Sequence, residues 1–272
     1  MNVIQKPDEM FIGRDVRIAH NVKINVTERL VIGDRSALNE HVSIEGRDVV
    51  IGREAWLDEY AFIGGGSCFE RQSTFRAGDF LHMGRFSHIN TAREVRVGHE
   101  CGVGVGTRIC THGAYPPQWE GFPVAFEQVT IGDRVWLPHA WVNPGVTIGS
   151  DVVVCAWSLV NRDLPSGCLA CGIPVRVIRE NEYPRALVEE EKQRLVHGIA
   201  QEIDMLPCET DPGIGYTDGQ LVYGETRFDL DRRRIEGPGD ERTERIRNQL
   251  RRHGVRFRYG IKSGRYVAWG ML

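Results

Sequence analysis

A histidine stands at the start of the longest irregular segment of this sequence. His112 follows the sequence Ile109-Cys110-Thr111 and precedes a stretch, 113–123, with three prolines and three aromatic residues. Such a stretch is typical of a stiff loop that packs against another surface. Imidazole titrates near neutral pH and can take a proton from a hydroxyl or an amine, so His112 is a candidate general base. From position alone, an ordinary exposed or packing histidine is the better interpretation.

Residues that commonly bind metals are present, but their spacing does not form a site. His82, His88 and His99 lie close together in the sequence, and three histidines could bind zinc. Cys168 and Cys171 form a C-x-x-C pair, but no second pair accompanies it. The cysteines number seven and are scattered, which favours free thiols in a reducing compartment. We therefore expect no metal.

The elements that must position these residues repeat every six residues. Aliphatic residues of the segment 129–180 recur at this spacing, with a single step of five, and a small residue follows several of them. Period six fits neither a helix nor a flat strand. It is typical of a chain that turns a corner every six residues and completes a triangular coil after three. The sequence therefore predicts a hexapeptide-type β-solenoid, in which inward aliphatic residues stack from coil to coil.

The same period extends back to residue 12 and gives about seven coils. Every insertion falls after a third hexad, so all loops are expected at one corner of the prism, the two largest being 64–76 and 112–130. Loops at one face of a repeat scaffold commonly carry function. The predicted inward residues, three to a coil, are Ile12, Ile18, Ile24; Ile32, Leu38, Ile44; Ile51, Leu57, Ile63; Ala77, Met83, Ile89; Val97, Val103, Ile109; Ile131, Leu137, Val142; and Ile148, Val154, Val160.

The six-residue period ends near residue 180, and three further segments follow. Residues 181–206 have helical character, and we expect this helix to cover the open end of the solenoid. Its predicted apolar face consists of Leu187, Leu195, Ile199 and Ile203. Residues 207–220 are rich in Pro, Gly and Asp and predict a linker. We therefore expect the domain boundaries 1–180, 181–206, 207–220 and 221–272.

Residues 221–272 predict a small basic α+β module. We expect a strand at 221–230, a helix at 240–253 and a hairpin whose strands are 255–259 and 266–269. Asp240 is a plausible N-cap of the helix and Gly254 a plausible C′ residue.

Charge separates this module from the rest of the chain. Between residues 227 and 265 there are 13 basic and 6 acidic side chains, a balance of +7 in a chain whose net charge is −3, so the remainder carries −10. The arginines either dock the module by pairing with acidic groups elsewhere or attract an anionic acceptor or carrier. No nucleic-acid-binding motif is present. No apolar run is long enough to span a membrane, and we expect a cytoplasmic protein.

Several pieces of the segment 129–180 resemble one enzyme family when they are taken together. They are the IGDRVW opening, NPGVTIG, the sequence Cys155-Ala156-Trp157-Ser158 and the close GIPVRVIRE. This order resembles the left-handed β-helix acyltransferases of the galactoside, maltose and xenobiotic acetyltransferase group. The resemblance implies a left-handed parallel β-helix, acetyl-CoA as co-substrate, a sugar acceptor, and a homotrimer with active sites between subunits. It does not extend to 221–272.

The resemblance also assigns roles to particular residues. His112 opens its loop where the family has the catalytic histidine. The resemblance implies that acetyl-CoA contacts five residues of the last coils, namely Trp136, Ala156, Arg162, Arg176 and Arg179. The acceptor would contact Asn90, with Ser87 and His88 beside it. Glu120 and Glu127 are both candidates to orient the imidazole.

We therefore expect an acetyl-CoA-dependent acetyltransferase that acts by direct transfer to a hydroxyl or amino group. Two alternatives remain open at this point. One is a zinc hydratase like the gamma carbonic anhydrases, and the other is a solenoid scaffold without catalytic activity.

Overall fold

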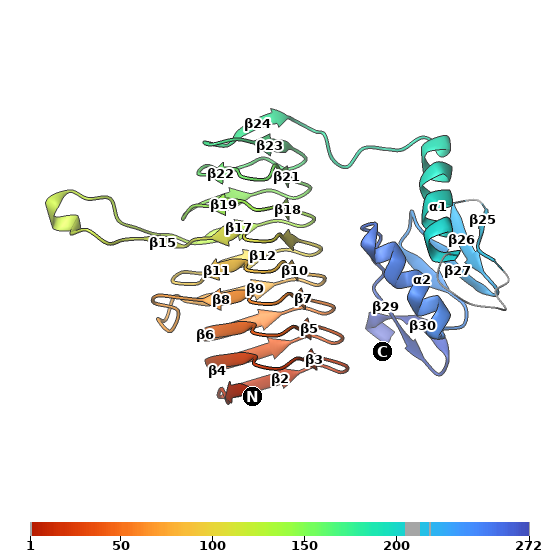
Figure 1. Cartoon of the computed structure of the whole chain (residues 1–272), viewed down its shortest axis with the longest axis horizontal. Helices are drawn as coiled ribbons and strands as arrows, with labels where there is room; N and C mark the ends of the chain where they lie inside the picture. Colours follow the sequence, from red (N-terminus) through yellow and green to blue (C-terminus); the bar gives the residue numbers. More distant parts are fainter. Residues whose placement is uncertain (1, 205–212, 218, 272) are drawn as a thin grey trace. The chain divides into compact units, whose positions relative to one another are not determined.

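The chain forms two units, and each is described by itself. The computed structural model describes residues 2–204, 213–217 and 219–271. Residues 1–185 make the first unit and 186–272 the second (Figure 1). The first boundary thus lies close to the predicted end of the solenoid. None of the described helices is long and apolar enough to cross a membrane.

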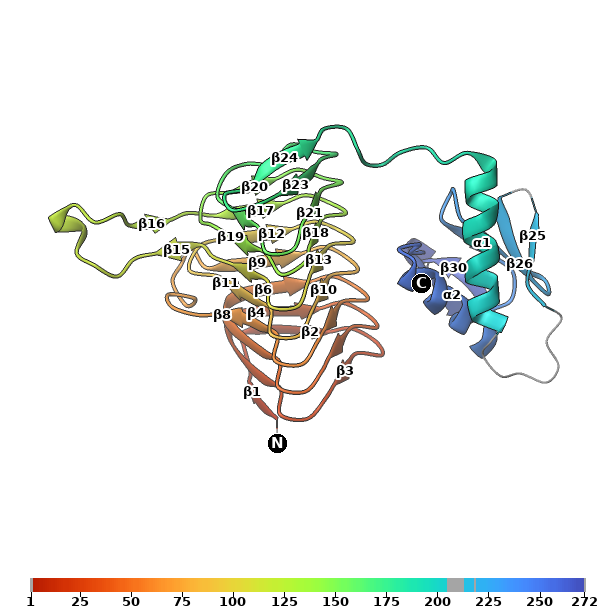
Figure 2. The same ribbon diagram turned by 45° about the horizontal axis from the view of Figure 1, so that its top comes forward.

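The first unit is a left-handed parallel β-helix with three faces (Figures 1 and 2). The first face consists of β2 (Glu9–Ile12), the second halves of β4 (Lys23–Ile32) and β6 (Ser43–Ile51), β9 (Thr74–Ala77), β12 (Val95–Val97), β17 (Val129–Ile131) and β20 (Thr147–Ile148). The second consists of β3 (Arg17–Ile18), β5 (Ala37–Leu38), β7 (Trp56–Leu57), β10 (His82–Met83), β13 (Gly102–Val103), β18 (Trp136–Leu137), β21 (Val153–Val154), β23 (Leu169–Cys171) and β24 (Arg176–Arg179). The third consists of β1 (Val3–Gln5), the first halves of β4 and β6, β8 (Phe62–Gly64), β11 (His88–Asn90), β14 (Arg108–Ile109), β19 (Trp141–Val142) and β22 (Leu159–Val160).

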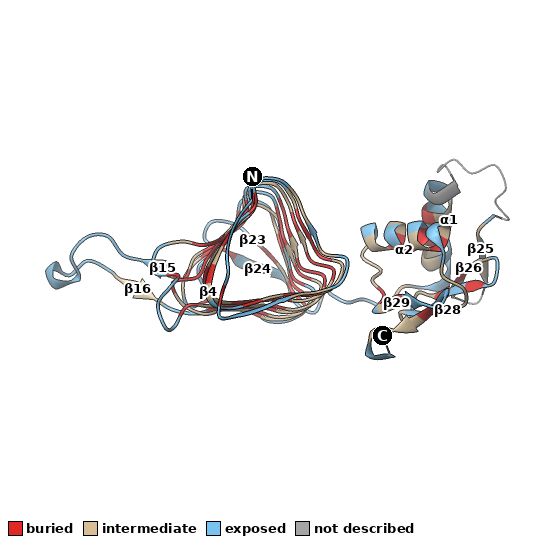
Figure 3. Cartoon of the chain, turned by 90° about the horizontal axis from the view of Figure 1, so that it is seen from below, coloured by how far each residue is buried: buried red, intermediate tan, exposed pale blue. Residues whose placement is uncertain are grey.

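The inward positions predicted from the period are confirmed. Nineteen of the 21 predicted residues are buried, and Ile12 and Ile18 of the first coil are half-buried and pack against the same core. They stack in register: Ile51 lies opposite Ala77 on the first face, and Ile89 lies opposite Ile109 on the third. Figure 3 looks along the coils and shows the buried residues lining the inside of the triangular section. The five-residue step to Val142 keeps this register, because Val142 still pairs with Ile109 and Val160.

The small residues of the repeat are required by the spacing of the coils. A Cβ atom at Gly52 would lie 2.5 Å from the carbonyl carbon of Gly78, and one at Gly33 would lie 2.5 Å from the amide nitrogen of Arg53. In both cases the obstacle is the backbone of the next coil, which no side-chain rotation can move. Glycine is therefore needed at these positions for close approach between coils.

Both predicted loops leave the prism at the corner between the third and first faces. The first follows β8 and ends at β9. The second begins with β15 (His112–Gly113), passes through the 3-10 helix η1 (Gln118–Glu120) and returns through β16 (Ala125–Phe126) as an antiparallel hairpin. This hairpin extends away from the coils (Figures 1 and 2). Tyr115 and Trp119 at its tip are 99% and 98% exposed, so they pack on none of the residues that the structure describes.

The second unit has its own core. A four-stranded antiparallel sheet of β25 (Gly215–Thr217), β26 (Gln220–Tyr223), β27 (Thr226–Asp229) and β28 (Arg234–Glu236) packs with helices α1 (Glu189–Asp204) and α2 (Glu241–Arg252). The hairpin of β29 (Tyr259–Lys262) and β30 (Arg265–Ala268) follows, and η2 (Trp269–Met271) ends the described chain. Asp240 caps α2 through the Thr243 amide, and Gly254 has a φ of 80°, as predicted. The expected single strand at 221–230 is instead the hairpin β26–β27, which turns at Gly224.

The role expected for the helix at 181–206 needs correction. Among the side chains that the structure describes in this helix, Val196 and Ile199 are buried and belong to the core of the second unit, while the predicted face residue Leu195 is 54% exposed. Lys192 also pairs with Asp231 at 2.7 Å. The helix is thus an element of the second unit by its packing. The predicted linker 207–220 falls partly outside the described residues, and its described end includes β25.

The expectation of free thiols also needs correction. Cys155 and Cys171 form a disulfide between successive coils. Cys68, Cys101, Cys110 and Cys168 are free, and Cys208 lies outside the described residues. Cys171 therefore does not pair within the C-x-x-C sequence, because the coil geometry places Cys155 opposite it.

We expect Gly52→Ala to destabilise the solenoid by about 1–3 kcal/mol, the usual range for overpacking. The added methyl group would overlap the backbone at Gly78. Urea unfolding followed by circular dichroism measures the change. Gly113→Ala is the matched control, because a Cβ atom there meets nothing within 4 Å. Equal stability of the Gly52→Ala protein and the wild type would contradict this account of the repeat.

We expect a chain that ends at Arg185 to fold as a β-helix without the second unit. Every residue of the solenoid core lies before this point, and helix α1 takes its buried contacts from the second core. Circular dichroism and cooperative thermal unfolding of the truncated chain test this. An insoluble or unfolded product would show that the solenoid needs the second unit.

Candidate active site

His112 lies against Asn90 at the corner from which the hairpin leaves. His112 begins β15, directly after the third face, and Asn90 ends β11 one coil below. The His112 Nδ1 atom is 2.8 Å from Asn90 Oδ1. The Thr111 hydroxyl lies 2.7 Å from the same oxygen. Asn90 is 5% exposed, so this amide is held inside the corner and does not face solvent.

Two backbone groups determine which way round the Asn90 amide lies. The Ala92 N–H, which can only donate, points to Oδ1 at 3.3 Å. The Gly64 carbonyl, which can only accept, lies 3.4 Å from Nδ2. Oδ1 is therefore the atom that faces the imidazole. Because an amide oxygen accepts and does not donate, His112 Nδ1 must carry the proton, and in the neutral ring Nε2 has its lone pair free to accept one.

The surroundings hold the ring and leave Nε2 room. Phe126 of the returning strand stacks on the imidazole, with ring centroids 5.5 Å apart. The Arg93 guanidinium lies over the Phe126 ring, 4.7 Å from its centroid. A Cβ atom at Gly66 would lie 3.8 Å from Nε2, so the bare backbone of the first loop passes beside this nitrogen. The arrangement is that of an oriented base with an open position next to it.

The other two residues predicted to contact an acceptor are placed differently. Ser87 is fully buried, so its hydroxyl does not face solvent in this chain, and its assignment to the acceptor stays a prediction. His88 is half-buried, and its Nδ1 lies 3.0 Å from Arg108 Nη1. Desolvation by burial is the main cause that lowers the pKa of His88, and the positive charge of Arg108 adds to it, while the Gly64 backbone acts in the opposite direction. His88 is thus held neutral, because its Nδ1 must accept from the guanidinium.

The orienting residue was missed by sequence reasoning. Glu120 lies in η1, and Glu127 uses its backbone N–H to bond the Thr111 carbonyl at 2.9 Å. Within the described residues, neither carboxylate bonds His112, and Asn90 does so instead. The signal was available: Ile89 pairs with Ile109 one coil away, so Asn90 and the residues 110–112 leave equivalent strands at the same corner.

Four of the five predicted carrier residues lie on the second face or its neighbouring corner. Trp136, in β18, lies flat over Gly102, where a Cβ atom would overlap its indole. Ala156 is exposed in the turn after β21. Arg176 and Arg179 both lie in β24, and Arg179 pairs with Glu182 at 2.9 Å. Their placement forms one row at the last coils, because β18, β21, β23 and β24 are consecutive in the sheet.

Arg162 is not brought to this row. It follows β22 and is exposed at the corner between the third and first faces. His112 leaves the prism at that same corner, whereas Ala156 lies at the corner between the second and third faces. The base and the predicted carrier row of one chain are therefore on different corners.

No group of three or more metal-binding side chains comes together among residues 2–204, 213–217 and 219–271. His82 pairs with Asp58 at 3.6 Å, and His99 accepts the Asp79 amide at 2.9 Å. These two histidines have contacts within the coils.

Known proteins resemble part of the chain. No protein-family model matches the sequence. Galactoside O-acetyltransferase of Escherichia coli (strain K12) is 32% identical over 140 residues, which are 47% of this chain and 68% of that protein. The putative colanic acid biosynthesis acetyltransferase WcaF of the same organism is 33% identical over 104 residues, 38% of this chain and 57% of that protein, so this match spans little more than half of its length.

Solved structures give similar matches. The polySia-specific acetyltransferase NeuO is 19% identical, with a TM-score of 0.45, over 74% of this chain and 98% of that one. The hexapeptide-repeat acetyltransferase VCA0836 from Vibrio cholerae O1 biovar eltor, solved with acetyl coenzyme A, is 21% identical, with a TM-score of 0.38, over 56% of this chain and 70% of that one. The match to galactoside O-acetyltransferase, at 32% identity over more than two thirds of that enzyme, shows that the chain belongs to the hexapeptide-repeat acetyltransferases of that family.

Proposed function

We propose that this protein transfers an acetyl group from acetyl-CoA to a hydroxyl or amino group of a sugar, with His112 as the general base. The observation that carries the proposal is the orientation of the Asn90 amide, which leaves His112 Nε2 as the proton-accepting atom. The sugar is supported by the names of the galactoside and colanic acid relatives. The carrier is supported by the family and by the row of Trp136, Ala156, Arg176 and Arg179.

The chain's own groups then act in a simple sequence. An acceptor hydroxyl or amine donates a hydrogen bond to Nε2, and its proton moves to the ring as it attacks the thioester carbonyl. The imidazolium that forms keeps its Nδ1–H bond to the Asn90 oxygen, so the ring does not turn during the transfer. Backbone N–H groups of a neighbouring turn hold the tetrahedral oxyanion. Nε2 then returns the proton to the departing CoA sulfur, so no covalent enzyme intermediate is needed.

Positively charged side chains would bind the phosphates of the carrier. Arg176 is exposed on the edge strand β24 and forms no ion pair with any described residue, so its guanidinium is available. Arg179 would have to share its guanidinium with Glu182. Guanidinium groups suit this task because they bind phosphate in a bidentate manner.

We expect His112→Ala to lower kcat for acetyl transfer by roughly 10²–10⁴, the scale of general base catalysis. The assay is chromatographic detection of CoA released from acetyl-CoA in the presence of a panel of amino and hydroxy sugars. Asn90→Asp should instead keep substantial activity and move the acidic limb of the pH–rate profile to higher pH, because a carboxylate next to Nδ1 stabilises the imidazolium.

Glu120→Gln is the matched control, because it alters a charged residue of the same loop without touching the imidazole. Near wild-type turnover in folded His112→Ala protein would remove His112 from the mechanism. A pH profile of Asn90→Asp that coincides with the wild type would show that Asn90 does not act on the ring. Failure of every sugar in the panel to release CoA would contradict the proposed acceptor class.

We further propose a homotrimer, because the base and the carrier row of one chain lie on different corners. A complete site then combines His112 of one chain with Ala156 of its neighbour, and the exposed Tyr115 and Trp119 are covered by that neighbour. Closed cyclic symmetry satisfies all such loops at once. Light scattering should give a mass near three times the chain mass of 30.7 kDa. Mixing His112→Ala chains with Ala156→Arg chains should restore activity that neither has alone.

Two outcomes would contradict the shared site. One is a mass near that of a single chain at assay concentration. The other is a mixed trimer, verified by mass, in which the two inactive variants fail to complement each other.

A further inference from the structure

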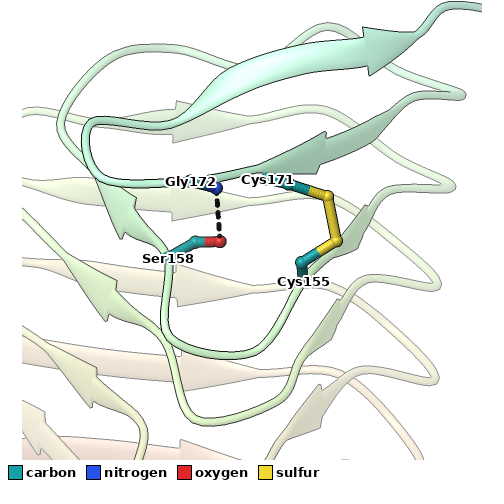
Figure 4. The surroundings of a disulfide bond; sticks show 4 residues. All are labelled: Cys155, Ser158, Cys171 and Gly172. Carbon is teal, nitrogen blue, oxygen red and sulfur yellow. Dashed lines mark hydrogen bonds between the residues drawn. A yellow bond between two sulfur atoms is a disulfide. The ribbon is translucent and has the colours of Figure 1, made fainter.

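The disulfide between Cys155 and Cys171 joins the last full coil to the strand pair that closes the solenoid. Cys155 follows β21 and Cys171 ends β23, and the two strands pair in parallel (Figure 4). Beyond Cys171 the chain turns at 172–175 and returns as β24, which pairs only with β23 and forms the edge of its sheet. We call β23, this turn and β24 together the closing hairpin. Besides the backbone that enters β23 from the preceding coil, the disulfide joins this hairpin covalently to the coils.

The disulfide lies directly between the predicted carrier contacts. On one side, Cys155 is followed by the exposed Ala156. On the other, Cys171 is the register partner of Arg176 across the closing hairpin. Any loosening of this hairpin therefore moves Arg176 relative to Ala156. The hairpin is also held by hydrogen bonds, such as Gly172 N–H to Ser158 Oγ at 3.0 Å, drawn in Figure 4, and by Ala170 and Val175, which are buried in the solenoid core.

The disulfide is also placed to react with small thiols. Cys155 and Cys171 are half-buried, and the neighbouring Trp157 and Ile173 are 69% and 74% exposed, so the corner is open to solvent. The free thiols are less suited to exchange. Burial is the main cause that raises the pKa of Cys68, of Cys110 and of Cys168, which keeps these thiols protonated at neutral pH.

We propose that the Cys155–Cys171 disulfide is a redox-sensitive latch on the closing hairpin, which low-molecular-weight thiols open and low-molecular-weight disulfides close by the reverse exchange. A thiolate attacks one sulfur, forms a mixed disulfide with that cysteine and releases the other as a thiolate. A second thiol then attacks the mixed disulfide, which leaves two cysteine thiols and one oxidised thiol dimer. Opening frees the edge strand β24 and lowers affinity for acetyl-CoA. The last statement rests on the proposed function; the opening of the hairpin does not.

The experiment compares the full chain before and after treatment with dithiothreitol, which is then removed under argon. Non-reducing peptide mapping establishes the 155–171 link, and mass spectrometry establishes its loss. Hydrogen exchange of the amides in 169–179 reports the hairpin, and calorimetric titration with acetyl-CoA, a thioester without a free thiol, reports affinity. We expect faster exchange confined to this hairpin. We also expect a roughly tenfold rise in the Kd of acetyl-CoA, the size of losing one charge-assisted hydrogen bond.

Variants separate the latch from general effects of reduction. The double variant Cys155→Ser/Cys171→Ser should show the reduced behaviour at once and no response to dithiothreitol. Cys168→Ala is the matched control, because it removes the other cysteine of the C-x-x-C sequence and should keep the full response.

The outcomes decide the proposal as follows. Loss of the response in Cys168→Ala would overturn it in favour of a 168–171 pair. Unchanged exchange and unchanged Kd after verified reduction would overturn the latch. If exchange rises as expected but acetyl-CoA binds in neither state, the latch stands while its effect on the carrier, and the proposed carrier itself, are wrong.

Discussion

The close spacing of successive coils is the constraint on which the rest of this structure depends. Parallel strands bonded from coil to coil bring the backbones so near at the corners that Gly33 and Gly52 have no room for a Cβ atom. The same spacing stacks each inward aliphatic residue on its counterpart, which gives a core that is continuous along the prism. A residue in a strand of an inner coil therefore has neighbours one coil above and one coil below at equivalent positions. The candidate active site is formed by residues that are stacked in this way.

The candidate base His112 is oriented by residues that are stacked from one coil to the next. Asn90 and Thr111 end up side by side because β11 and β14 are adjacent, and the hairpin begins at the next residue, His112. Backbone groups of Ala92 and Gly64, themselves fixed by the coils, set the direction of the Asn90 amide. The tautomer of the neutral imidazole is thus decided by the scaffold, although the histidine itself belongs to a loop. An amide suits this position, because it accepts from Nδ1 without adding a negative charge that would hold the ring protonated.

Much of the solenoid could be predicted because its rule is local and repeated. The six-residue period, seen at Ile131 and Leu137, predicts inward-facing residues as distant as Ile24. The places of the insertions predict the corner from which the loops leave. Outside the repeat the same approach was weaker. In helix α1, Leu195 and Val196 are adjacent apolar residues, and only the partner surface decides which one is buried. That partner is the core of the second unit, whose sequence has no period from which its location could be inferred.

Within the site, residue identity was easier to predict than residue contact. His112 could be found from its place at the start of a loop, but its partner could not. The choice between Glu120, Glu127 and Asn90 depends on how the chain returns over the 22 positions that separate Asn90 from His112. In a solenoid this return is fixed by the coil length, so contacts follow once residues are compared at equivalent strand positions. The same comparison pairs Cys155 with Cys171, 16 residues apart, rather than Cys168 with Cys171. For this fold, separation by one coil is a better guide to chemistry than closeness in sequence, since adjacent residues of a strand face opposite sides while residues one coil apart face the same side.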